Sequence, residues 1–207
     1  SKKTFVKSVN VIEIGRGDNT LDEEEIKQII ETNEQLDAVI YLQSANTIDA
    51  IEYPEMAKQG LMLAFVLAKL CNVKNAAKAR ASFVVVTRQG GALGFANDDG
   101  HSKVKANVKI DLVQAGLAGL VKTLSHEWNA DASNEGSSVF CRVIDLSAKL
   151  AADKVATIIG DELLDVDTSV IEVAHDTDNL SNNLGSRLTL ISVVTDSYAL
   201  TPSTNSI

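Results

Sequence analysis

The chain has 207 residues, of which 45% are hydrophobic and 23% are charged, and its formal net charge is −9. This length and composition suit one folded α/β domain of ordinary core size, and the acidic balance argues against a nucleic-acid partner, because affinity for a phosphate backbone comes mostly from clustered Lys and Arg. The start has no apolar signal-peptide core, and the most apolar window, 60–71, is shorter than the ~20 residues of a membrane span, so we expect a cytoplasmic protein without a membrane partner.

The first third of the chain alternates strand and helix patterns. Residues 9–14 alternate apolar and polar side chains, which predicts a strand, and Thr20 to Glu23 has capping-box spacing for a helix at 21–32. Residues 36–42 form a nearly continuous apolar run, which is typical of a central parallel strand covered on both faces. The helix predicted at 56–71 is apolar on almost every side, so we expect it to be buried on more than one face.

A buried strand is predicted at 81–87, and the segment after it, RQGGALGF, resembles a glycine-rich phosphate loop. A phosphate loop needs a helix that begins at the glycines. The residues that follow are polar and include Asp98 and Asp99, which would repel a phosphate. We therefore expect a flexible surface loop here, not a dinucleotide site.

The remaining elements complete an alternating order. Residues 110–128 predict an amphipathic helix, 138–146 a strand and 153–164 a helix, and residues 168–174 and 187–194 predict an antiparallel hairpin at one edge. Alternation of this kind implies an α/β, doubly wound, mainly parallel sheet with helices on both faces and a C-terminal β-hairpin.

Metal and thiol chemistry find little support in the sequence. Cys71 and Cys141 lie in apolar stretches without a CxxC partner, and we expect both to be buried free thiols. His101, His126 and His175 are widely spaced, and no HExxH, HxxxH or Cys/His cluster occurs. We therefore expect no metal site.

The helix at 110–128 resembles the helix that carries the catalytic Tyr and Lys of short-chain dehydrogenases and reductases. Aligned on its ending, Leu124 to Trp128, it places Ile110 at the Tyr position and Gln114 at the Lys position. Ile cannot transfer a proton, and a neutral Gln cannot stabilise a phenolate. Thr87 stands where such reductases have a Ser. We expect no catalytic residue, no bound cofactor and no enzymatic activity in this chain alone.

Three stretches resemble the structural, non-catalytic half of the ketoreductase domain in polyketide synthases and multifunctional fatty acid synthases: Ser82 to Arg88, Gln114 to Trp128 and Arg142 to Leu146. The acidic, proline-poor sequence is most similar to the large subunit of bacterial omega-3 polyunsaturated fatty acid synthases. The resemblance implies a truncated Rossmann-like subdomain at 1–195 and a linker at 196–207 towards a downstream catalytic half. That half would use NADPH and a phosphopantetheine-linked acyl substrate, and acyl carrier domains would be further partners in the full synthase.

The resemblance also implies that the two halves pack through their long central helices. The sequence itself offers two such helices, and Gly116 and Gly119 would permit close backbone approach. We expect a docking face that includes Leu61, Phe65, Leu112, Gly116 and Leu120. Two alternatives remain open: a divergent reductase that itself binds NADP(H), and an interaction domain unrelated to reductases.

Overall fold

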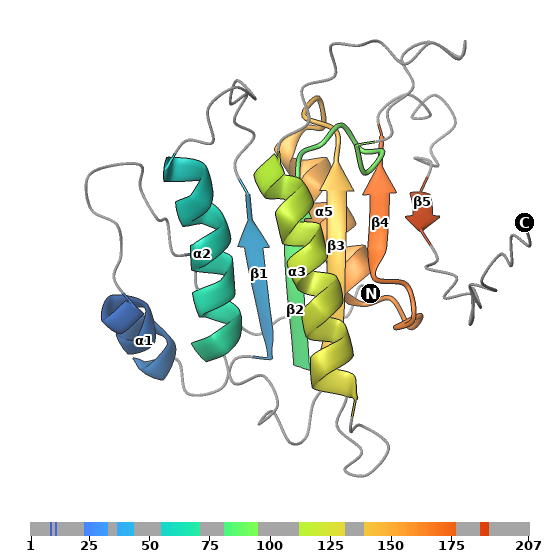
Figure 1. Ribbon diagram of the computed structural model, residues 1–207. Coiled ribbons are helices and arrows are strands. Elements are labelled where there is room, and N and C mark those ends of the chain that lie inside the picture. Colours follow the sequence, from blue (N-terminus) through green and yellow to red (C-terminus); the bar gives the residue numbers. More distant parts are fainter. Residues whose placement is uncertain are drawn as a thin grey trace, which may run out of the picture.

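The computed structural model describes residues 9, 11, 23–32, 37–43, 55–70, 81–94, 112–130, 139–176 and 187–190. Helices and strands alternate along this part of the chain (Figure 1). The helices are α1 (Glu23–Thr32), α2 (Glu55–Leu70), α3 (Leu112–Asn129) and α5 (Ala152–Leu163), and the strands are β1 (Ala38–Leu42), β2 (Ala81–Thr87), β3 (Val139–Leu146), β4 (Glu172–His175) and β5 (Arg187–Leu190).

The five strands form one sheet in the order β1-β2-β3-β4-β5. Strands β1 to β4 are parallel, and β5 runs antiparallel to β4, with His175 opposite Arg187. The expected α/β fold, a mainly parallel sheet with helices on both faces and a C-terminal hairpin, is confirmed. The helix predictions agree with α1, α2, α3 and α5 to within a few residues at the ends that are described.

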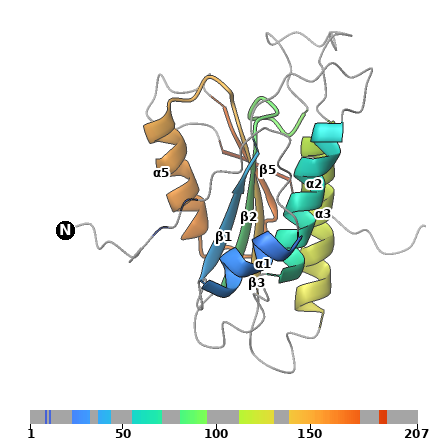
Figure 2. The same ribbon diagram turned by 90° about the vertical axis from the view of Figure 1, so that its left-hand side faces the viewer.

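Helices α2 and α3 cover one face of the sheet and α5 covers the other (Figure 2). The alternation of side chains along β2 and β3 produces two cores. Phe83 and Val85 pack on the α2–α3 side together with Leu117 and Val121, and Val84 packs on the α5 side. Both inner strands are buried along their whole length, as parallel strands covered on both faces should be.

The crossovers do not all have the same hand. The strand order advances in one direction from β1 to β4, yet the helix between β3 and β4 lies on the opposite face from the helices of the first two crossovers. The β3–α5–β4 crossover therefore has the opposite hand to the first two, which is uncommon in parallel sheets. As a result, the chain leaves β2 towards one face and leaves β3 towards the other.

Strand β1 is an edge strand of the described sheet, and the expectation of a central strand covered on both faces is wrong for this reason. Val39 and Tyr41 pack against the α2–α3 core. Ile40 and Leu42 point to the other face and are 40% and 64% exposed. The apolar run shows which residues can be buried. The position of the strand in the sheet, and whether α5 covers it, decide which of them are buried.

The first predicted strand, 9–14, lies largely outside the described residues. Val9 and Val11 are described, belong to no strand and are exposed. The proposed boundary at residue 195 and the linker at 196–207 also lie outside the described residues. Ile26, in the helix predicted at 21–32, is buried in α1, with 4% of its surface exposed.

Candidate functional site

The carboxyl ends of β2 and β3 meet at Thr87 and Asp145, which are partners in the parallel register. Both side chains are fully buried. The Thr87 hydroxyl donates a hydrogen bond of 2.9 Å to Oδ1 of Asp145. The residue at the Ser position of a reductase is therefore bonded to an internal carboxylate.

The glycine-rich loop after β2 folds around this same carboxylate. The backbone N–H of Gln89 donates to Oδ1 of Asp145 at 2.6 Å. The N–H groups of Gly91, Ala92 and Leu93 donate to Oδ2 at 2.9, 3.0 and 2.8 Å. The expectation of a flexible surface loop is wrong for residues 88–94, because four main-chain bonds to one buried side chain order the loop.

The backbone of the loop has the conformation that such convergence requires. Successive N–H groups turn towards one point when the chain enters the left-handed region, and this arrangement forms an anion-binding concavity called a nest. Leu93 adopts a φ of 54°, in the left-handed region that residues with a side chain rarely enter. In this conformation its N–H donates to Asp145. The glycines with positive φ are Gly90 (100°), Gly91 (76°) and Gly94 (79°).

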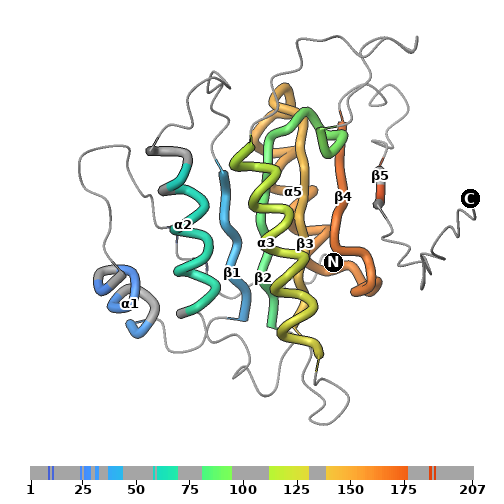
Figure 3. The backbone as a smooth tube through the Cα atoms, viewed as in Figure 1, coloured from blue at the N-terminus to red at the C-terminus, as the bar shows by residue number. Residues whose placement is uncertain are grey.

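The loop also reaches across the sheet to the end of β4, as the tube in Figure 3 shows. A Cβ at Gly91 would stand 2.8 Å from the carbonyl carbon of His175 and closer still to its oxygen. Arg88 extends in the same direction and donates from Nη1 to the Ser147 carbonyl at 3.0 Å. Asp145, the loop and the end of β4 thus form one packed unit.

Gln114, at the Lys position of a reductase, is 2% exposed on the inner side of α3. Its Oε1 accepts the backbone N–H of Arg88, which joins α3 to the start of the same loop. Ile110, at the Tyr position, lies outside the described residues. Gln114 holds the loop through a neutral amide contact, and a protonated Lys could not accept that N–H.

The five expected docking residues differ in what they contact. Leu61 and Leu120 are partly buried against the α2–α3 core. Gly116 faces Leu61, whose Cδ2 would be 3.4 Å from a Cβ at that position, so this glycine lies beside α2 of the same chain. Phe65 and Leu112 are 48% and 59% exposed. These two side chains are the ones free to meet another surface.

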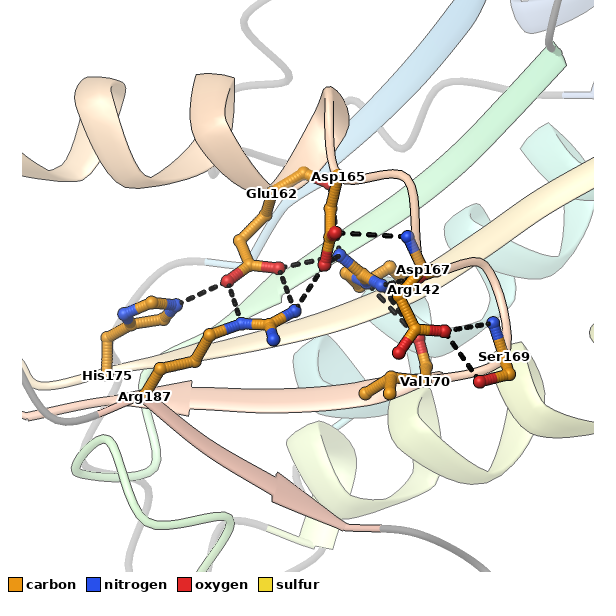
Figure 4. Close-up of polar contacts among 8 residues, drawn as sticks. All are labelled: Arg142, Glu162, Asp165, Asp167, Ser169, Val170, His175 and Arg187. Atoms are coloured by element: carbon orange, nitrogen blue, oxygen red, sulfur yellow. Dashed lines mark hydrogen bonds and ion pairs between the residues drawn. The ribbon is translucent and has the colours of Figure 1, made fainter.

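A second polar centre was not predicted from the sequence. Arg142 points from β3 towards α5 and is fully buried, with its guanidinium 2.7 Å from Oε2 of Glu162 and 2.9 Å from Oδ2 of Asp165 (Figure 4). Glu162 also accepts from Arg187 Nε at 2.7 Å and lies 2.8 Å from His175 Nε2. The group links β3, the end of α5, β4 and β5.

The guanidinium of Arg142 has further partners on the main chain. It donates to the carbonyls of Val170, Glu162 and Asp167, and it stacks over the Phe140 ring at 4.6 Å from the ring centroid. Carbonyl groups at the end of a helix lack hydrogen-bond partners within the helix. Arg142 reaches the end of α5 from β3, so one guanidinium donates both to the carboxylates and to these main-chain carbonyls.

The charges of this cluster control the ionisation of Glu162. Burial opposes ionisation, but hydrogen bonds from His175 and Arg187 and the charges of both arginines outweigh it and lower the pKa of Glu162 to about 2. The pKa of Asp165 is lowered first by the backbone N–H of Asp167. The pKa of Arg187 is raised, mainly by its hydrogen bond to Glu162. Glu162, Asp165 and Arg187 are therefore ionised at neutral pH.

A signal for this cluster was present in the sequence. Arg142 interrupts the buried run VFCRVIDL, and a charged residue inside a strand covered on both faces needs ionic partners. The sequence does not say which acids supply them, because Glu162 and Asp165 approach Arg142 only through the packing of α5 against β3.

Cys141 is buried and free, as expected, and burial raises the pKa of its thiol to about 12, so it is unreactive at neutral pH. Cys71 lies outside the described residues. Among the residues that the structure describes, no group of three His, Cys, Asp or Glu is placed to hold a metal ion. In the same part of the chain, no helix has the length and apolar character needed to cross a membrane.

No family model matches this sequence, and no curated protein matches it. Among solved structures, the chain is similar to the "Pseudomonas aeruginosa RhlG/NADP active-site complex", with 14% identity and a TM-score of 0.41. The match covers 70% of this chain and 56% of that one, so the chain spans little more than half the length of that protein. At this identity and TM-score the likeness says nothing about the activity of this chain.

Proposed function

We propose that this chain is the non-catalytic structural half of a ketoreductase in a multifunctional polyunsaturated fatty acid or polyketide synthase, and that it packs on and stabilises the NADPH-dependent β-ketoacyl reductase half. One observation supports this more than any other. At the carboxyl edge of the sheet, Thr87, Gln114 and the backbone N–H groups of residues 88, 89 and 91–93 have internal partners, and Asp145 receives most of these bonds. Groups engaged in this way hold the subdomain in shape.

The surface of the two long helices supports the docking part of the proposal. Helix α2 was expected to bury more than one face, yet Met62 and Phe65 are 51% and 48% exposed. Leu112 at the start of α3 is also exposed. These residues lie on the two helices that pack side by side on one face of the sheet (Figure 1). Met62 and Phe65 are three residues apart and so lie on the same face of α2, and exposed apolar side chains that form one patch mark a protein contact site.

The proposal is tested by producing the chain together with the reductase segment encoded downstream of it. We expect the two to copurify, and we expect β-ketoacyl reductase activity to require the complex. Phe65→Gln and Leu112→Gln should weaken copurification and activity. Val166→Gln is the matched control, because Val166 is 91% exposed in the turn after α5, away from α2 and α3.

Two results would overturn the proposal. One is a reductase segment that is equally stable and active without this chain. The other is saturable micromolar binding of NADPH to this chain alone, which would favour a divergent reductase.

A further inference from the structure

The carboxyl ends of β2 and β3 have the geometry at which doubly wound folds bind ligands. In such folds the site lies where the strand order reverses, so that two adjacent strands send their connections to opposite faces of the sheet. The strand order does not reverse here, but the opposite hand of the β3–α5–β4 crossover produces the same divergence of connections. Here the connection after β2 leads to α3 on one face, and the connection after β3 leads to α5 on the other (Figure 2). Asp145 stands at that point, at the end of β3.

Asp145 is held there as a bound anion would be. Its two carboxylate oxygens accept five hydrogen bonds, one from the Thr87 hydroxyl and four from the backbone N–H groups of residues 89 and 91–93. All five donors are neutral, so the carboxylate is stabilised by converging dipoles, in the way that nests stabilise phosphates and other oxyanions. Leu93, which donates one of these bonds, has a φ of 54°, in the left-handed region that turns successive N–H groups towards one point.

We propose that the loop at 88–93, together with Thr87, is an oxyanion-binding nest whose resident ligand is the chain's own Asp145 carboxylate, and that a small free carboxylate occupies the nest when that side chain is removed. The class of ligand follows from the size and shape of the side-chain group that the substitution removes. Replacement of Asp145 by Ala deletes one planar carboxylate from a site with no exposed surface, and formate matches that group in shape and charge. This inference goes beyond the proposed docking function and does not depend on it.

The test is chemical rescue of Asp145→Ala, measured on the whole chain by thermal unfolding at constant ionic strength. In chloride the variant should melt several degrees below the wild type, because the nest N–H groups are left buried without an acceptor. Formate should restore a large part of that loss in a saturable way, and acetate should restore less. If the variant does not fold in chloride, formate should recover the fold.

Two further variants separate the nest from general salt effects. Val121→Ala also empties a fully buried position, but that position lies in the apolar core under α3 and should show no response to formate. Asp145→Asn fills the space and keeps one acceptor oxygen, but its NH2 group faces the N–H groups that bonded the other oxygen, so it should be destabilised and insensitive to formate. The wild type should not respond.

The site of rescue can be located by NMR. In Asp145→Ala, formate should shift the amide signals of Gly91, Ala92 and Leu93 and leave those of α5 unchanged. Equal rescue by chloride and formate, rescue of Val121→Ala, or failure to fold in both salts would overturn the proposal. None of these outcomes bears on whether the chain docks on a reductase half, since no partner is present in the experiment.

Discussion

Gly91 lies directly against the main chain of His175, although one belongs to the loop after β2 and the other ends β4. A side chain at Gly91 would overlap the His175 carbonyl, and the backbone there has φ 76°. This contact closes the loop over Asp145 and joins it to the edge of the sheet. A change that disrupts this contact should therefore destabilise the loop, its bonds to Asp145 and the end of β4 together.

We predict that Gly91→Ala lowers the free energy of unfolding by about 2 kcal/mol or more, because the new methyl group meets rigid main chain and the left-handed conformation disfavours Ala. Gly119→Ala is the matched control. A Cβ at Gly119 meets nothing within 4 Å on the exposed side of α3, so this change should stabilise the helix by up to about 1 kcal/mol. Urea denaturation of the two variants measures both values, and equal effects would refute the contact.

The two arginines that share Glu162 should differ in importance, because Arg142 is fully buried and Arg187 is 35% exposed. Arg142→Met removes the partner of two carboxylates and of three main-chain carbonyls and should cost about 3–5 kcal/mol. Arg187→Met leaves Glu162 paired with Arg142 and should cost about 1 kcal/mol, since solvent screens the exposed guanidinium. The denaturation midpoints of the two variants measure this difference. A larger loss of stability in Arg187→Met than in Arg142→Met would contradict the described roles of the two arginines.

Acid should weaken the fold through Glu162. Its pKa is about 2 when folded against an ordinary 4.5, so ionised Glu162 stabilises the folded state above about pH 4.5, and this contribution is lost as the pH falls from there through about 2. The loss from Glu162 should be about 3 kcal/mol, and the lowered pKa of Asp165 acts in the same direction. Glu162→Gln should be less stable at neutral pH and lose this part of the acid dependence. If the free energies of unfolding of the variant and the wild type changed with pH in parallel, Glu162 would not be the source of the acid dependence.

The sequence predicts the inner elements of the fold well because their burial is complete. Strands β2 and β3 are apolar runs that the structure buries on both faces, and α5 has one apolar stripe that faces the sheet. Strand β1 has an equally apolar run, but its position at the edge leaves Leu42 exposed. Strand order is a property of the whole sheet, and no local pattern contains it.

The polar centres are predicted less well, for a related reason. The local sequence of the loop RQGGALG predicts a flexible surface loop, because Asp145, the side chain that orders it, is more than 50 residues away in the chain. The parallel register brings it there, because the carboxyl ends of neighbouring strands meet at one edge. The same holds for Arg142, whose carboxylate partners, Glu162 and Asp165, lie at the end of α5 and in the turn after it.

Gln114 provides a direct test of whether the reductase Lys position has a structural role in this chain. Gln114→Lys should lower the free energy of unfolding by about 2 kcal/mol or more, because it removes the acceptor of the Arg88 N–H and places an ammonium group at a buried position. Ala115→Lys, at the next and exposed position of α3, should stay within about 0.5 kcal/mol of the wild type. Both values come from urea denaturation. A Gln114→Lys variant as stable as Ala115→Lys would mean that the buried amide contributes little to holding the loop over Asp145.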